Sequence, residues 1–164
     1  MLDTITQTST RMTEARMLAA LERKILWLSS WTVHNANHLR PNVDGVKVGG
    51  HQASSASVAA IMTALYLGVL RPEDRVAVKP HASPVFHAIQ YLLGRQTRER
   101  LEAFRAYKGA QSYPSRTKDP DEVDFSTGSV GLGPAAPLFA AAVRRYVDAH
   151  FGERPASRFV ALLG

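Results

Sequence analysis

The chain has 164 residues, of which 45% are hydrophobic and 21% are charged, as in an ordinary soluble domain with one buried core. It contains no cysteine, which excludes disulfides and thiolate metal sites and favours a cytoplasmic location. The net charge of +6 comes from basic residues spread along the chain, so nucleic acid is not expected as a partner. We find no apolar run of the roughly 18 residues that a membrane span needs, so membrane association is not predicted.

Hydrophobic periodicity places the regular elements in chain order. It predicts a helix over 10–31, a helix over 53–67, a short strand over 75–78, helices over 83–93, 97–107 and 134–151, and a strand over 158–163. Gly68 and Thr97 have the residue types of helix caps, at the end of the second helix and at the start of the fourth. The polar segments 34–44 and 108–133 are expected as loops. A loop as long as the second is usually functional or disordered, and its turn residues together with the aromatic Tyr113 and Phe125 favour an ordered binding loop.

Helices that alternate with short apolar strands predict an α/β protein, here with an incomplete doubly wound parallel sheet and flanking helices. Such sheets bind ligands beyond the carboxyl ends of their strands. We expect an N-terminal helical extension over 1–40 and a ligand-binding domain over 41–164. Because the sequence stops at Gly164, directly after the second strand, part of the site is expected to lie beyond that residue.

Three loops bring chemically capable residues to the starts of helices. His51 follows Gly49 and Gly50, His81 follows the first strand, and a glycine-rich stretch covers 127–134. Histidine donates and accepts protons near neutral pH, and glycine lets a backbone approach a flat ligand closely. Together the loops predict a cofactor-binding site. The alternatives are local contacts of each histidine with backbone carbonyls at a helix start, and a plain flexible turn for the glycine-rich stretch.

Other histidines and aromatic residues are less informative. His34 and His38 lie four residues apart and could bind a metal from a helix, but no third ligand is close in sequence, so a metal site is not predicted there. Whether either enters the cofactor site is left open. His87, Tyr91 and Tyr146 have apolar neighbours at helical spacing and are expected in the core.

Four motifs resemble a known superfamily. They are Gly-His-Gln-Ala-Ser at 50–54, His-Ala-Ser-Pro at 81–84, Ser-Tyr-Pro at 112–114 and Ser-Val-Gly-Leu-Gly-Pro at 129–134, followed by an apolar strand that ends in glycine. In this order they resemble the thiamine-diphosphate-binding half of the transketolase superfamily, and within it the homodimeric pyruvate dehydrogenases, over 42–164. Transketolases have a histidine in the motif that corresponds to Ser-Tyr-Pro. Its absence here favours a 2-oxo acid over a sugar phosphate as donor.

The resemblance implies roles for particular residues. His51 and His81 would be catalytic, as hydrogen-bond donors or proton carriers next to the thiazolium ring and the substrate. The implied cofactor, thiamine diphosphate, would be bound by Ser54, His81, Gly128, Val130 and Gly131. For Ser54, a helix N-cap role is the alternative. The superfamily's Mg²⁺ ligands and activating glutamate would lie beyond Gly164, so no metal ligand is expected in this chain, and the isolated chain is expected to be inactive.

The implied function is that of a fragment of an enzyme that decarboxylates a 2-oxo acid such as pyruvate and passes the acyl group to lipoamide. The implied partners are a second subunit in a homodimer, or the remainder of the same enzyme, and a lipoyl-bearing acyltransferase. Two alternatives stay open: a transketolase-type ketol transfer between sugar phosphates, and a non-catalytic half-module of a split enzyme. The apolar strand over 158–163 should also favour self-association.

Overall fold

The computed structural model describes the backbone of residues 2–163 and the side chains from residue 12 onward, so Gly164 lies outside the described residues. Helices dominate, and two short strands pair in parallel, which confirms an α/β chain with a small parallel sheet. The elements in chain order are α1 (Leu2–His34), a π-helical turn (Asn35–Leu39), α2 (Gln52–Ala64), a second π-helical turn (Leu65–Val69), β1 (Arg75–Ala77), a 3₁₀ turn (Pro80–Ala82), α3 (Ser83–Leu92), α4 (Arg98–Glu102), α5 (Leu132–Phe151) and β2 (Phe159–Ala161).

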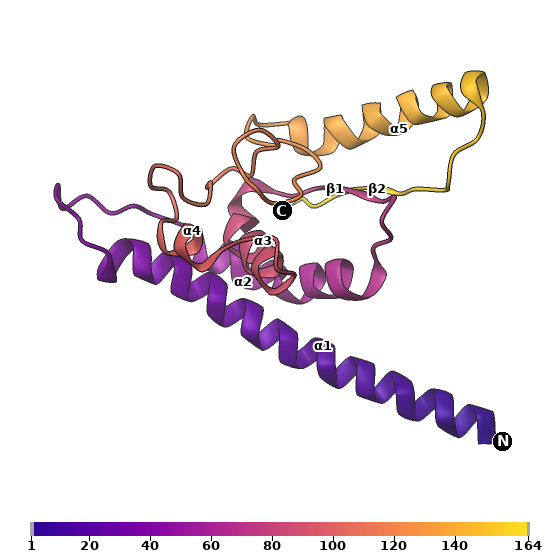
Figure 1. Ribbon diagram of the computed structural model, residues 1–164, viewed down its shortest axis with the longest axis horizontal. Coiled ribbons are helices and arrows are strands. Elements are labelled where there is room, and N and C mark those ends of the chain that lie inside the picture. The colour runs from indigo at the N-terminus through magenta and orange to yellow at the C-terminus, as the bar shows by residue number, and fades with distance from the viewer. Residues whose placement is uncertain (1, 164) are drawn as a thin grey trace.

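The main hydrophobic core lies where α1, α2, α3 and the sheet meet. Ile25 and Leu28 of α1 pack there with Met62 of α2, Ile89 of α3 and Val76 of β1. Full burial of side chains of this size stabilises a fold by about 1.5–3 kcal/mol each relative to exposure. Figure 1 shows the C-terminal part of α1 against α2 and α3, while its N-terminal end extends beyond the rest of the molecule.

The two strands lie between helical layers. β1 and β2 run parallel, with Arg75 opposite Phe159. α5 covers one face of this sheet, and the core that includes α2 and α3 lies on the other (Figure 1). Just before β1, the buried Asp74 carboxylate accepts the backbone N–H of Arg158 at 2.7 Å and pairs with the Arg158 guanidinium. This ion pair ties together the starts of the two strands.

The first helix is longer than the apolar pattern predicts. α1 begins before residue 10, and its π-helical turn extends into the segment 34–44 that we expected as a loop. The backbone N–H of Arg40 donates to the carbonyl oxygen of Asn35 at 2.9 Å, so the helix widens instead of ending. The side chains of Asn35 and Arg40 find a hydrogen-bond partner in this turn, because both donate to the carbonyl oxygen of Glu102, at 3.0 and 3.2 Å.

α2 and α4 also end elsewhere than expected. Gly68 is not a cap, because the second π-helical turn carries the helix past it. Thr97 is the N-cap of α4, its hydroxyl accepting the N–H of Arg100 at 3.3 Å, as predicted. α4 nevertheless stops well before residue 107. The chain turns back after it, with Arg105 and Lys108 in the left-handed region of backbone space at φ of 62° and 61°.

Two of the three expected core residues pack in the interior. His87 is fully buried, and Tyr91 is half-buried against the main core. The expectation is wrong for Tyr146, which is 58% exposed on α5. α5 packs on the sheet with one side only, so the periodic apolar residues of its other side lie on the surface of the described structure.

One helical segment, Gln52–Val69, is long and apolar enough to cross a membrane by length and composition alone, with a mean hydropathy of 1.3. The sequence expectation that no such run exists is therefore corrected. The signal is weak, because core helices of soluble proteins share it. Only 28% of the segment is buried in the fold, and this part includes Val58, Ala59 and Met62 of α2.

Candidate functional site

The two candidate histidines lie next to each other. His51 directly precedes α2, and His81 lies in the 3₁₀ turn that follows β1. Their ring centroids are 4.2 Å apart, with an interplanar angle of 52°. Both side chains are exposed, so a ligand can reach them. The hydroxyl of Ser55 lies 3.5 Å from the carbonyl oxygen of His81 and links α2 to the turn. The two loops therefore converge, while the roles of the histidines stay a prediction.

The charge around His51 is positive. Partial desolvation of the ring, the neighbouring His81 and the cations Arg105 and Lys79 together hold the pKa of His51 below its ordinary value. His51 is therefore mainly neutral at pH 7, and a neutral imidazole can accept a proton or donate a hydrogen bond. The same cations favour an anionic ligand at this end of the sheet.

The segment that leads into the glycine-rich loop is hydrogen-bonded to β1 and to the residue after it. One edge of β1 pairs with β2, and the other is bonded by side chains. The N–H of Val76 donates to the Asp124 carboxylate at 2.8 Å, and the hydroxyl of Thr127 donates to the carbonyl oxygen of Val78 at 2.5 Å. The loop therefore starts at the carboxyl end of β1, where His81 also lies. This is the edge at which parallel sheets bind their ligands.

Gly128 and Val130 present free backbone groups. In the described part of the chain neither residue uses its N–H or C=O in a hydrogen bond, and the Val130 side chain is fully exposed. A Cβ at Gly128 would lie 3.5 Å from the Cβ of Tyr113, at ordinary contact distance. Gly131 has a φ of +89° and is the N-cap residue of α5.

Ser54 lies inside the first turn of α2, and His51 holds the N-cap position. The alternative of an N-cap role for Ser54 is therefore excluded. Its carbonyl oxygen accepts the hydroxyl of Ser57 at 2.9 Å, and its own hydroxyl has no partner among the described residues. Ser54 thus carries a free hydroxyl one turn away from His51.

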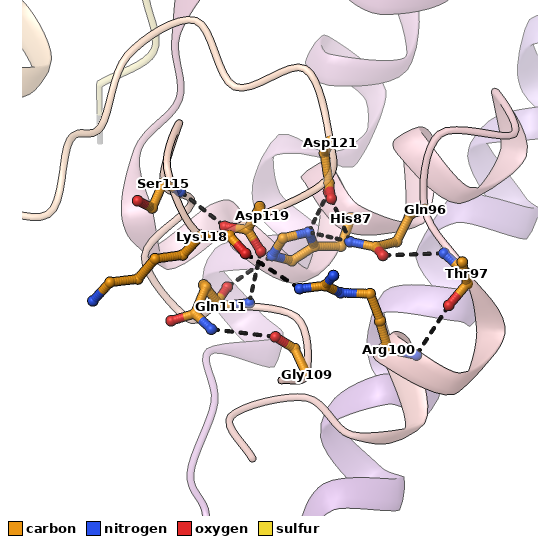
Figure 2. Close-up of polar contacts among 10 residues, drawn as sticks. All are labelled: His87, Gln96, Thr97, Arg100, Gly109, Gln111, Ser115, Lys118, Asp119 and Asp121. Atoms are coloured by element: carbon orange, nitrogen blue, oxygen red, sulfur yellow. Dashed lines mark hydrogen bonds and ion pairs between the residues drawn. The ribbon is translucent and has the colours of Figure 1, made fainter. Parts of the chain in front are cut away.

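His87 is the centre of a buried hydrogen-bond network that the sequence did not reveal (Figure 2). Its Nδ1 lies 2.7 Å from the Asp121 carboxylate, and its Nε2 lies 2.7 Å from the carbonyl oxygen of Gln111. The Asp119 carboxylate accepts the N–H of Gln111 at 3.2 Å, and the Gln96 amide donates to Asp121 at 2.5 Å. Both backbone groups of Gln111 are therefore fixed, which positions the Ser-Tyr-Pro motif that follows.

His87, Asp119 and Asp121 are also grouped as metal ligands could be, with one ligand atom from each within 4.8 Å of the others. Both ring nitrogens of His87 and all four carboxylate oxygens already have hydrogen-bond partners in the protein. A metal would have to replace these bonds, so we assign the group a structural role. The exposed rings of His34 and His38 lie 4.9 Å apart, with no third ligand among the described residues.

A polar cleft of about 550 Å³ lies beside the loop that leads to His51. Its lining residues include Lys47 and Val48 of that loop, Arg105, and Ser112 and Tyr113 of the Ser-Tyr-Pro motif. The motif therefore lies across a solvent-accessible space from the chain that carries His51. A small polar substrate has room to approach along this cleft.

The α/β fold thus places two adjacent histidines and a glycine-rich loop at the end of a parallel strand, which is the edge where parallel sheets generally bind their ligands. The chain is 37% identical over 134 residues to the pyruvate dehydrogenase E1 component of Mycobacterium tuberculosis, 36% over 146 to that of Pseudomonas aeruginosa, and 32% over 147 to that of Escherichia coli. These matches cover 75%, 82% and 84% of this chain. The chain is therefore a relative of the pyruvate dehydrogenase E1 components, which confirms the resemblance carried by the four motifs.

The shared region is a small part of those relatives. The chain spans 14%, 16% and 16% of their respective lengths. No protein-family model matches the chain. The activity, substrates and partners of the whole relatives are therefore proposals for this chain.

Proposed function

We propose that this chain forms part of the active site of a thiamine-diphosphate-dependent enzyme that decarboxylates a 2-oxo acid, with pyruvate as the first candidate substrate. The observation that carries the proposal is the pairing of His51 and His81, with ring centroids 4.2 Å apart, at the end of β1 where the glycine-rich loop is attached. Similarity to the pyruvate dehydrogenase E1 components supports the choice of chemistry. In this proposal 41–164 is the N-terminal part of a doubly wound cofactor-binding domain and 1–40 is a helical extension.

The described residues fit the proposed cofactor. When bound, thiamine diphosphate supplies a carbon nucleophile and an electron sink for decarboxylation. The free backbone groups of Gly128 and Val130 match the donors and acceptors on an aminopyrimidine edge. The left-handed Gly131 lets the loop turn sharply into α5. The basic surroundings of His51 favour the charge of a diphosphate or a carboxylate.

The two histidines have complementary roles in this proposal. His51, mainly neutral at pH 7, is able to accept a proton or to donate a hydrogen bond to a carboxylate. His81 lies against it and contacts the cofactor, and the free hydroxyl of Ser54 is a further donor. The charged groups that act on His51 are all basic, so we propose that the carboxylate ligands of Mg²⁺ come from residues other than those described.

The proposal also covers the location of the protein, its oligomeric state and its partner. We propose a cytoplasmic protein that acts as a homodimer or with the remainder of the same enzyme. The acyl acceptor would be a lipoyl-bearing acyltransferase. The relatives' designation as a component supports an assembly of this kind.

A nuclear magnetic resonance titration of the isotope-labelled chain with thiamine diphosphate and Mg²⁺ tests the proposal. We expect the imidazole signals of His51 and His81 and the amide signals of Gly128 and Val130 to shift together and to saturate at one ligand concentration. Thiamine without its diphosphate should bind more weakly, because the basic residues then have no anion to attract.

His34 and His38 are the internal control, since they are an adjacent exposed pair elsewhere in the fold. No shift at His51 and His81, or equal shifts at all four histidines, would contradict the proposal. Adding pyruvate or a ketose phosphate to the loaded chain then tests the substrate class. A response to the ketose phosphate alone would favour the transketolase-type alternative.

A further inference from the structure

We propose that Asn37 and Arg105 are positioning residues, which hold the backbone of Val48 and Gly49 and thereby set how His51 faces His81. Neither residue was singled out by the sequence motifs, and each comes from a different part of the chain. The inference rests on the proposed function in one respect, the catalytic role of His51. The contacts that carry it belong to the ligand-free chain.

Asn37 pairs with both backbone groups of Gly49. Its amide nitrogen donates to the carbonyl oxygen of Gly49 at 2.8 Å, and its carbonyl oxygen accepts the N–H of Gly49 at 2.8 Å. The same amide nitrogen donates to the carbonyl oxygen of Val33 at 2.7 Å, which ties the loop to the end of α1. Only a carboxamide offers a donor and an acceptor side by side, so this double contact depends on the residue type.

Arg105 holds the neighbouring peptide unit. Its guanidinium donates to the carbonyl oxygen of Val48 at 2.8 Å. The residue has a φ of 62°, a conformation that is costly for a side chain other than glycine or asparagine. Its backbone N–H donates to the carbonyl oxygen of Ala110 at 3.0 Å, and the adjacent Phe104 is fully buried, so the surrounding fold maintains this conformation.

The two glycines before His51 are what allow these contacts. A Cβ at Gly49 would lie 2.8 Å from a guanidinium nitrogen of Arg105, and a Cβ at Gly50 would lie 2.6 Å from Cγ1 of Val33. Both glycines have positive φ, at +81° and +135°. The loop is therefore packed closely on α1 and on Arg105, and His51 emerges from it at one fixed place, the N-cap of α2.

Arg105 also acts on the charge of His51. Its cation is one of the causes that keep the pKa of His51 low, together with partial desolvation of the ring, His81 and Lys79. Removing the guanidinium should therefore raise the titration midpoint of His51 as well as loosen its position. Asn37 carries no charge, so its removal should loosen the position without this direct electrostatic change.

The test compares Asn37→Ala and Arg105→Ala with Asn35→Ala in the ligand-free chain. Asn35 is the matched control, because its amide lies in the same helical turn and donates to a distant carbonyl oxygen, that of Glu102 at 3.0 Å, but makes no hydrogen bond to the loop. The measurements are the cross-peak between the His51 and His81 rings, the titration midpoint of His51, and the thermal unfolding midpoint.

We expect the ring cross-peak to be lost in Asn37→Ala and Arg105→Ala and kept in Asn35→Ala. The His51 midpoint should rise in Arg105→Ala, and Arg105→Lys should restore it in part because the charge remains. If Asn37→Ala fails to fold, Asn37→Asp replaces it, since this variant keeps the acceptor for Gly49 and loses the donor. An unchanged cross-peak in the folded Asn37 and Arg105 variants, or equal loss in Asn35→Ala, overturns the inference.

A failure of the positioning role can be distinguished from a failure of the proposed function. The cross-peak and the midpoint are measured without cofactor, so a chain that fails to bind thiamine diphosphate still reports on positioning. Conversely, cofactor binding with an unchanged cross-peak in the variants would leave the proposed function standing and remove the positioning role.

Discussion

His87 is a single residue on which a whole loop depends. The ring is fully buried, and its two nitrogens face the Asp121 carboxylate and the carbonyl oxygen of Gln111, each at 2.7 Å. Removing the ring leaves a carboxylate and a carbonyl group buried without these partners. A buried polar group that loses its hydrogen-bond partner costs about 1–3 kcal/mol, because the group stays desolvated.

We therefore predict that His87→Leu destabilises the chain by about 2–6 kcal/mol in urea unfolding, because two buried groups lose their partner. The double variant His87→Leu with Asp121→Leu should lose less than the sum of the two single variants, because neither partner is left alone. Glu102→Gln is the control, since it breaks the exposed pair with Arg98 and should cost under about 1 kcal/mol. Equal losses in His87→Leu and in the control would contradict a structural role for the network.

The residues of the site differ in how far the sequence could predict them. His51 and His81 stand beside glycine and proline at loop-to-helix junctions, a local signal that a single sequence shows. The network around His87 could not be predicted, because its partners lie 24 and 34 residues further along in a loop without periodicity. Asn37 and Arg105 were missed because they bond backbone groups 12 and 57 residues away, and a backbone group leaves no signal in the sequence.

At the level of elements, α5 shows how two nearby glycines can have opposite effects. Gly131 has a φ of +89° at the N-cap of the helix, and Gly133 lies within the first turn. A Cβ at either position would meet nothing within 4 Å, so backbone conformation alone decides. We predict that Gly131→Ala destabilises the chain by about 1 kcal/mol. Gly133→Ala should stabilise it by about 0.5–1 kcal/mol.

Thermal unfolding of the two variants checks this prediction. Each variant is the control of the other, because both add one methyl group to open space a single residue apart. A stabilising Gly131→Ala would mean that the loop does not need its left-handed turn. The amide signals of Gly128 and Val130 should also move in Gly131→Ala and stay in place in Gly133→Ala.

Asp74 makes the pairing of the two strands sensitive to pH. Its hydrogen bonds with the Arg158 side chain, and then with the backbone N–H of Arg71, hold its pKa well below the usual value. The unfolded chain therefore takes up a proton at higher pH than the folded chain. The stabilisation is fully present above the ordinary aspartate pKa of about 3.9, and it is lost as the pH falls through the lower folded value.

We predict that Asp74→Asn is less stable than the parent chain at pH 7 and that the difference shrinks as the pH falls below about 4. Urea unfolding at a series of pH values measures both. Glu73→Gln is a suitable control, because its carboxylate is adjacent in sequence and contributes no bond to β2. A stability difference that stays constant from pH 7 down to pH 3 would contradict the assignment.

Helix and strand positions were predictable where apolar residues face one core, as in α2, α3 and β1. Helix ends were not predictable where long-range contacts decide. The π-helical turn after α1 is bonded to the carbonyl oxygen of Glu102, and α4 ends where Arg105 takes a left-handed conformation that no local pattern signals. The apolar periodicity of α5 gave a wrong prediction of burial for Tyr146. Periodicity shows that a helix has an apolar face, but it does not show whether that face packs inside the chain or lies on its surface.

At the level of the whole molecule, an apolar surface remains uncovered. Leu138, Phe139 and Val143 of α5 are each at least 60% exposed, and Tyr146 and Phe151 continue the same helix. The edge of β2 away from β1 has no strand partner among the described residues. Apolar surface and an open strand edge both favour association between chains.

We therefore predict concentration-dependent association of the purified chain, measured by sedimentation velocity. Phe139→Ser combined with Val143→Ser should weaken it at least severalfold, because the variant removes apolar area without touching the core. Ile61→Ser, another exposed apolar residue on α2, serves as the control and should have a smaller effect. A clean monomer at high concentration would contradict the prediction.

The ion pair between Asp74 and Arg158 has a consequence at the opposite end of the sheet. It fixes the starting point of β2 on β1, and a slip of one residue would turn every side chain of β2 to the other face. His81 lies beyond the far end of β1, so the same register determines which backbone positions of the second strand stand beside it. Asp74 lies away from the histidines, but by fixing the register of β2 it determines which residues of that strand lie next to them.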